Sequence, residues 1–225
     1  MSFFSDDSTA FLAPTAIIDY PHPGVQAFVR EHDVPDADAR TRAVKLYYAV
    51  RDRIRYDPYE IVLSAEGLSA GRCATLGRGW CVSKAALLTA CCRAIGIPAR
   101  PGYADVKNHL STARMRAIMR TDEFRWHGYT AILLDGKWVK ATPAFNVELC
   151  EKFRLRPLEF DGREDSIYHP FDLEGRQHME YLRYRGEFAD LPLVEMSTDF
   201  ARFYAHMMDQ IRNGDFDAEV KRETA

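Results

Sequence analysis

The run from Cys81 to Ile95 is the feature that most constrains the fold of this chain. It reads "CVSKAALLTACCRAI", and its apolar residues recur with the spacing of one helix face: Cys81, Ala85, Leu88, Cys92 and Ile95. Gly96 and Pro98 follow, and residues of these types commonly end a helix. At 225 residues, the chain is long enough to bury such a helix in one core. The sequence therefore predicts a buried central helix with Cys81 at its N-terminal end.

A β-hairpin is predicted over residues 124–145. Two runs rich in apolar and β-forming residues flank Asp135-Gly136, which is a strong hairpin signal. His127 falls on the first strand and Thr142 at the end of the second. Residues 99–108 are expected to be extended as well. Since strands and helices do not alternate along the chain, the pattern indicates an α+β fold.

Helical spacing and capping residues predict the remaining elements. Helices are expected over residues 24–32, 36–56, 111–121, 147–153, 177–186 and 197–214. Asp36 or Asp38 would cap the second of these, and Ser197 or Thr198 would cap the last. Residues 59–79 and 157–172 are expected to be irregular loops, because they are rich in glycine and polar residues.

Charge and composition exclude several classes of protein. The net charge is −3, so a basic nucleic-acid-binding surface is not expected. The N-terminal segment carries acidic residues where a signal peptide has basic ones, and no apolar run reaches the roughly 18 residues of a membrane span. The odd number of cysteines does not suggest a disulfide framework. We therefore expect a cytoplasmic protein without membrane contact, of undetermined oligomeric state.

Cys81 could act as a nucleophile because a helix N-terminus stabilises a thiolate. A nearby imidazole would take the thiol proton, and the backbone N–H groups around Cys81 and Trp80 could hold an oxyanion. The Gly77-Arg78-Gly79 approach allows a close turn, and His127 comes later on a strand. Cys91 and Cys92 lie in the helix body and are expected to be inert.

The cysteines could have three other roles. A lone cysteine is most often packing material. A zinc site is disfavoured, because the chain contains no Cys-x-x-Cys pair and no matching histidine pair. A disulfide between Cys91 and Cys92 would be strained, since neighbouring helical residues point about 100° apart.

The segments "GWCVSKAALLTACCRAIGIPARPG" and "WHGYTAILLDGKWVKATP" resemble the bacterial transglutaminase-like superfamily. The resemblance covers about residues 40–146, leaving 147–225 as a C-terminal extension of a single transglutaminase-like domain that spans residues 1–225. It implies a papain-like (cysteine proteinase) α+β fold, with the nucleophile helix on an antiparallel sheet. It also implies a Cys–His–Asp triad in which Cys81 matches the nucleophile and His127 the base.

The third triad position departs from the family pattern. Thr142 stands where the resemblance places an aspartate, and a threonine cannot stabilise an imidazolium by charge. Asn146 is an alternative for orienting the histidine, as asparagine serves this role in papain-type enzymes. The late loop offers further carboxylates: Asp161, Asp165 and Asp172.

The resemblance implies an enzyme that acts on peptide or protein amide bonds by hydrolysis or acyl transfer, with no metal or other cofactor. Hydrolysis is the favoured outcome. The alternative is a catalytically weak or inactive fold that binds a peptide or protein, which the missing aspartate motivates. His109, the run His169-Pro170-Phe171-Asp172 and His178 are further cleft candidates, although surface turns or loops are the plainer interpretation.

Overall fold

The computed structural model describes residues 7–108, 112–168, 172–175, 179–211 and 214–224. Its main sheet has four antiparallel strands in the order β5-β4-β3-β6. They are β3 (Ala99–Asn108), β4 (Glu123–Leu134), β5 (Lys137–Ala141) and β6 (Met179–Glu187). The predicted hairpin is confirmed: Asp135 and Gly136 turn between β4 and β5, both with positive φ.

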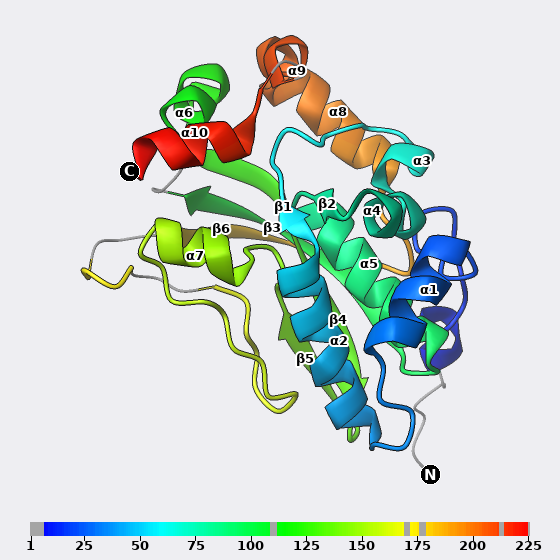
Figure 1. Ribbon diagram of the computed structural model, residues 1–225. Coiled ribbons are helices and arrows are strands. Elements are labelled where there is room, and N and C mark those ends of the chain that lie inside the picture. The colour runs from blue at the N-terminus through cyan, green and yellow to red at the C-terminus, as the bar shows by residue number, and fades with distance from the viewer. Residues whose placement is uncertain (1–6, 109–111, 169–171, 176–178, 212–213, 225) are drawn as a thin grey trace.

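The central helix is α5 (Cys81–Ala94), and it begins and ends close to the predicted positions. It packs on β4 and β3 and is surrounded by α1 (Pro23–His32), α2 (Ala39–Arg53) and α4 (Ala70–Leu76) (Figure 1). Every residue from Cys81 to Arg93 is buried, so α5 is enclosed on all sides rather than on one face. The predicted α+β architecture, with a buried helix on an antiparallel sheet, is confirmed.

Local signals account for most helix positions. Asp38 caps α2 by accepting a hydrogen bond from the Thr41 N–H at 2.9 Å. The helices α6 (Ala113–Met119) and α7 (Val147–Lys152) lie inside the predicted ranges. α2 ends at Arg53, three residues earlier than predicted, because Arg55–Tyr56 forms the short strand β1.

The prediction of an irregular loop over residues 59–79 is wrong. This segment contains α3 (Ala65–Leu68), α4 and the short strand β2 (Arg78–Gly79). Ser64 and Ser69 cap the two helices by accepting backbone N–H groups. Burial of Leu68 and Cys73 supplies the packing that such short helices need.

The predicted helix over 177–186 is also wrong, since residues 179–187 form β6. Pairing with the open edge of β3 satisfies this backbone and outweighs its helical propensity. The last predicted helix is instead two helices, α8 (Leu193–Phe203) and α9 (Ala205–Ile211), and it starts before Ser197. α10 (Phe216–Glu223) was not predicted.

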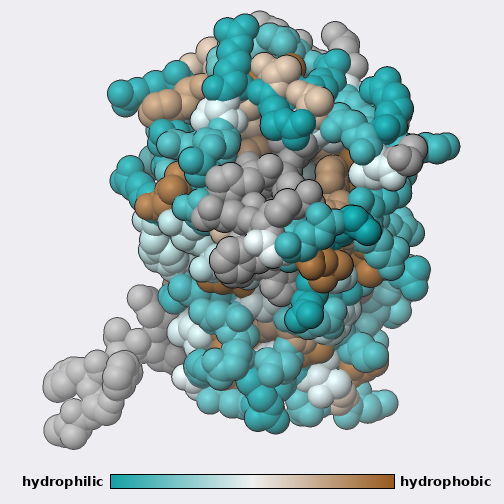
Figure 2. Space-filling model, turned by 90° about the vertical axis from the view of Figure 1, so that its left-hand side faces the viewer, coloured by the Kyte–Doolittle hydropathy of each residue, from teal (hydrophilic) through white to brown (hydrophobic). Residues whose placement is uncertain are grey.

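The helices α6, α8, α9 and α10 gather at one end of the sheet (Figure 1). The face of the molecule on the side of α7 and α10 is largely hydrophilic, and its hydrophobic residues form small separate patches in the part that the structure describes (Figure 2). No helix among the described residues is long and apolar enough to cross a bilayer.

Candidate active site

Cys81 is the first residue of α5, and a small parallel pairing fixes where that helix starts. β1 pairs with β2 through Arg55 with Arg78 and Tyr56 with Gly79. A Cβ on Gly79 would lie only 2.4 Å from the Ser83 hydroxyl oxygen and 3.0 Å from the Cys73 sulfur, so this approach requires glycine. The pairing brings Tyr56 to the N-terminal end of α5, beside Cys81.

Gly128 allows β4 to touch the start of α5. A Cβ at Gly128 would lie 3.0 Å from both the Cys81 carbonyl oxygen and the Val82 Cα, which are backbone atoms. His127 is the preceding residue, and it pairs with Ala104 of β3. The close contact therefore sets His127 next to the first turn of α5.

A bulge in the sheet adjoins His127. The register between β3 and β4 shifts at Asp105, and Trp126 has a φ of +63°, which is unfavourable for a bulky residue. The Asp105 carboxylate accepts the Trp126 N–H at 3.1 Å, and the Asp199 carboxylate accepts the Trp126 indole N–H at 2.9 Å. These bonds hold the strained residue that precedes His127.

Arg185 of β6 completes this arrangement. Its guanidinium donates to both oxygens of Asp105, at 2.5 and 2.9 Å, and lies 4.3 Å from the Trp126 ring centre. It also forms an ion pair with Asp199 of α8 at 2.6 Å. Asp105, Arg185 and Asp199, which we call the Arg185 clamp, thus join β3, β6 and α8 around the backbone that carries His127.

Cys81 and His127 line one cavity of about 50 Å³, which is room for a few water molecules. Its other walls come from the β1 region, β3, α6, the segment before α7, β6 and the α8–α9 segment. Most of the lining side chains are apolar, and they include Trp80, Phe145, Phe200 and four methionines. The cavity thus brings the predicted nucleophile and the predicted base to one apolar space.

The Cys81 thiol is protonated at neutral pH in this arrangement. Burial raises its pKa to about 11, and hydrogen bonds from the backbone N–H groups of Gly128, Val82 and Cys81 act in the opposite direction. A thiol of this kind becomes a thiolate only when a base takes its proton during the reaction. His127 is the imidazole that shares its cavity.

Trp80 occupies the N-cap position of α5 and provides no side-chain cap. The Trp80 side chain therefore caps none of the backbone N–H groups of the first turn, which carry the positive end of the helix dipole and of which two, on Cys81 and Val82, hydrogen-bond to the Cys81 sulfur. The Trp80 ring packs against Phe200, with ring centres 5.8 Å apart. Trp80 thus lines the cavity, and its role as a cleft or oxyanion residue stays a prediction.

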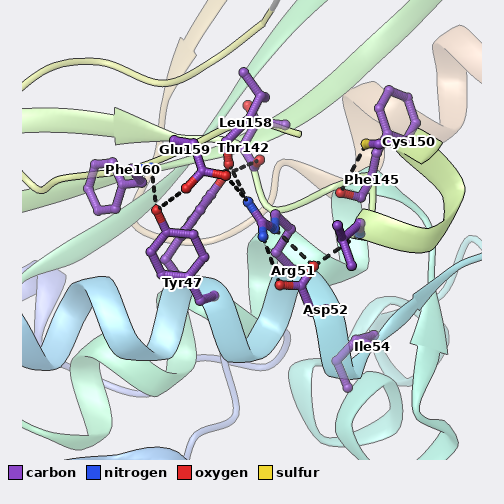
Figure 3. Close-up of polar contacts among 12 residues, drawn as sticks. Tyr47, Arg51, Asp52, Ile54, Thr142, Phe145, Cys150, Leu158, Glu159 and Phe160 are labelled. Carbon is purple, nitrogen blue, oxygen red and sulfur yellow. Dashed lines mark hydrogen bonds and ion pairs between the residues drawn. The ribbon is translucent and has the colours of Figure 1, made fainter. Parts of the chain in front are cut away.

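Thr142 lies near His127 but makes no hydrogen bond to it. Both residues line a second, smaller cavity. The Thr142 hydroxyl is buried without a hydrogen-bond partner in the described part of the chain, whereas its carbonyl accepts from the Tyr47 hydroxyl at 3.3 Å (Figure 3). The structure therefore holds Thr142 through its backbone, and the side chain does not orient the imidazole.

Asn146 is directed elsewhere. Its carboxamide oxygen accepts the Tyr56 N–H at 3.1 Å, and it lies at the start of α7. Asp161 and Asp165 are exposed, and the carboxylate of each accepts a hydrogen bond from a neighbouring backbone N–H group. Asp172 is the buried member of the late-loop aspartates, and one of its oxygens accepts the Glu174 N–H at 2.8 Å.

The other four cysteines do not share this cavity. Cys73, Cys91, Cys92 and Cys150 are buried, all five thiols are free, and burial raises the pKa of each. The described residues hold no group of three or more His, Cys, Asp or Glu side chains that could bind a metal. His109, His169 and His178, which we had considered for the cleft, lie outside the described residues.

Comparison with known proteins decides the family. A family model described as the transglutaminase-like superfamily matches residues 26–143, which is more than half of the chain. The chain belongs to the transglutaminase-like superfamily. The match starts earlier than the predicted limit of residue 40 and ends close to the predicted limit of 146. The α5 helix on its antiparallel sheet is thus a fold of the transglutaminase-like type.

No curated protein matched the sequence. Among solved structures, a "Putative Cysteine Protease" from Cytophaga hutchinsonii matches with 17% identity and a TM-score of 0.48. The alignment covers 83% of this chain and 55% of that one, so this chain spans about half the length of the solved protein.

Sequence reasoning missed the Arg185 clamp of this transglutaminase-like chain and the four methionines that line the cavity, which we call the methionine wall: Met115, Met119, Met179 and Met207. Asp105 carried a signal, because an aspartate inside the apolar strand segment "GYADV" is unusual in a buried position. Met115 and Met119 lay on one face of the predicted 111–121 helix. Their partners on β6 and α9 could not be found, since β6 was predicted to be a helix.

Proposed function

We propose that this transglutaminase-like chain is a cysteine enzyme that acts on amide bonds. The observation that carries the proposal is that Cys81, at the start of α5, and His127, on β4, line the same cavity. Cys81 is the nucleophile and His127 the base. The substrate is a peptide or protein amide, and no cofactor takes part.

In the first half-reaction, His127 takes the thiol proton as the Cys81 sulfur bonds to the amide carbonyl carbon. The carbonyl electron pair moves to oxygen, and the backbone N–H groups of the uncapped first turn of α5 stabilise this negative charge. The carbon–nitrogen bond then breaks, and the leaving amine receives the proton from His127. A thioester on Cys81 remains.

In the second half-reaction, His127 deprotonates a water molecule or an incoming amine, which attacks the thioester. The carbon–sulfur bond then breaks, and the Cys81 sulfur receives the proton from His127. Water gives a carboxylic acid, and an amine gives a new amide. We favour hydrolysis, because the cavity holds only a few water-sized molecules and its described walls present no carboxylate to attract a cationic amine.

The test is to trap the thioester. The protein is mixed with a panel of 4-nitrophenyl esters and peptide amides, quenched in acid and analysed by peptide mass spectrometry. The proposal expects an acyl adduct on Cys81 in the wild type and none in Cys81→Ala. Cys91→Ala serves as the matched control, since it removes a buried thiol from the same helix.

A non-catalytic binding role is the second candidate, and the unpartnered Thr142 hydroxyl favours it. The family pattern places an aspartate at position 142. Because the Thr142 side chain makes no hydrogen bond to the imidazole, it does not stabilise the imidazolium as an aspartate would. In this case no member of the panel would acylate Cys81, and Cys81→Ala would bind peptides as tightly as the wild type.

A further inference from the structure

The cavity in front of Cys81 has a wall of unusual composition. Four of the seven methionines in the chain line it: Met115, Met119, Met179 and Met207. Methionine side chains are unbranched, polarisable and adaptable, so they fit closely around flexible apolar groups. They come from α6, β6 and α9, three elements that meet over the start of α5.

Two polar side chains that line the cavity, Tyr204 and Arg125, are already engaged with the protein, whereas the buried Trp80 indole N–H has no hydrogen-bond partner in the described part of the chain. The Tyr204 hydroxyl donates to the Glu123 carbonyl at 2.8 Å and accepts the Arg125 N–H at 2.9 Å. The Arg125 guanidinium pairs with the Glu123 carboxylate at 3.2 Å and lies 3.7 Å from the Phe203 ring centre. A polar group entering the cavity would therefore lose its hydration without finding a free partner on Tyr204 or Arg125.

Charge also limits what can enter. No aspartate or glutamate is among the described residues that line the cavity, so a lysine-like or arginine-like group would meet no counter-ion. A negatively charged group would compete with Glu123 for Arg125. Both considerations favour an uncharged occupant.

The volume of the cavity then limits the shape of the occupant. The cavity measures about 50 Å³, whereas an engineered protein cavity that binds benzene is about 150 Å³. An aromatic ring would require the methionines to move apart. A narrow, unbranched chain of a few carbons can enter along the flexible side chains.

We propose that this cavity is an acyl pocket that selects uncharged, unbranched aliphatic acyl groups over aromatic and charged ones. The acyl group on the Cys81 sulfur would lie between α6, β6 and α9. The role of this pocket in catalysis rests on the proposed function, but its binding preference can be measured without catalysis.

The experiment uses the full chain with Cys81→Ala, labelled with ¹³C at the methionine methyl groups. Acetamide, butyramide, hexanamide and phenylacetamide are titrated and followed by NMR. The methyl signals of the four wall methionines should shift. Met196 provides an internal control, because it is buried in α8 but does not line the cavity.

The affinity should increase about fourfold for each added methylene until the cavity is full. Hexanamide should therefore bind more than tenfold tighter than acetamide and tighter than phenylacetamide. Met119→Ala should raise the affinity for phenylacetamide relative to hexanamide about fivefold, while Met196→Ala leaves that ratio unchanged. Equal affinity across the chain lengths, or tighter binding of phenylacetamide, would overturn the proposal.

Acylation of the wild type by 4-nitrophenyl acetate and hexanoate separates this inference from the proposed function. If the amides show the chain-length preference but no ester acylates Cys81, the pocket stands and the proposed catalysis fails. If both esters acylate Cys81 equally and the amides show no preference, the catalysis stands and the pocket inference fails.

Discussion

Two regions of the molecule contribute to the cavity in different ways. The helix α5 and the strand β4 lie within the family match and provide Cys81 and His127. The elements β6, α8 and α9 lie beyond residue 143 and provide Met179, Phe200 and Met207 to the wall. We call these the catalytic region and the C-terminal region.

Under the two proposals above, the catalytic region would perform the chemistry and the C-terminal region would set the substrate selectivity. The candidate reacting groups sit on two elements packed into the core, whereas much of what surrounds them comes from a later part of the chain. The Arg185 clamp joins the two regions, because Arg185 of β6 pairs with both Asp105 of β3 and Asp199 of α8. Changes in one region should therefore affect the other mainly through the clamp and the wall.

The largest effect should come from the catalytic region. Cys81→Ala should lower the rate of ester or amide turnover at least about 1,000-fold, because the nucleophile is lost. Cys91→Ala, on the same helix, should stay within about threefold of the wild type. Turnover of a 4-nitrophenyl ester measures both. Equal losses in the two variants would mean that Cys81 has no special role.

Breaking the Arg185 clamp should have the second-largest effect. Arg185→Met leaves the buried Asp105 carboxylate without its main counter-charge, and the free energy of unfolding should fall by about 3 kcal/mol or more. Arg183→Met, an exposed position on the same strand, should change it by less than about 0.5 kcal/mol. Urea unfolding measures both values. If the two variants lose equal stability, the clamp does not join the regions.

Lys84 links the catalytic region to α2 and should make stability depend on pH. It is fully buried, and its ammonium donates to the Arg51 and Ile54 carbonyls. Burial lowers the pKa of Lys84 to about 7, from 10.5. Between these values the unfolded chain binds the proton and the folded chain does not, so the folded state gains stability as pH rises.

The free energy of unfolding should therefore increase between about pH 7 and 9, by at most about 1.4 kcal/mol per pH unit from this group. Lys84→Met should remove that slope. Urea unfolding at a series of pH values compares the two proteins. The same slope in both would show that Lys84 keeps an ordinary pKa when folded.

A smaller effect is expected at the contact between β4 and α5. Gly128→Ala places a methyl group against the Cys81 and Val82 backbone, which should cost about 1–3 kcal/mol of stability. The acylation rate should fall as well, because His127 moves relative to Cys81. Thermal unfolding and ester turnover measure these effects. Unchanged acylation at reduced stability would show that the contact does not position His127.

The smallest effect is expected at Thr142. Its buried hydroxyl has no hydrogen-bond partner in the described part of the chain, so Thr142→Val should change stability by less than about 1 kcal/mol, toward stabilisation. Acylation should stay within about threefold of the wild type. A tenfold loss of acylation at unchanged stability would instead place Thr142 in the catalytic machinery.

The catalytic region was largely predictable from the sequence. The α5 periodicity, the Gly-Ile-Pro-Ala-Arg ending and the Asp135-Gly136 turn are local signals, and local signals fix helix ends and hairpins. They placed Cys81 and His127 correctly on their elements. Their roles in catalysis stay predictions until the adducts are measured.

The C-terminal region was not predictable for a physical reason. "MEYLRYRGE" has residues that suit a helix, but the unpaired edge of β3 recruits this backbone as β6. The methionine wall depends on that pairing, because Met179 reaches the cavity from β6. Asp105 and Arg185 are 80 residues apart, and only the register of β3 with β6 brings them together.

The most direct test of the account is the pH dependence of Cys81 alkylation by iodoacetamide, in the wild type and in His127→Ala. Peptide mass spectrometry follows all five cysteines in the same samples. If His127 takes the thiol proton during the reaction, the wild type should already react at neutral pH, whereas His127→Ala should react only as pH approaches about 11, where the buried thiol itself ionises. Identical profiles in the two proteins would contradict the account, because His127 would then have no part in activating Cys81.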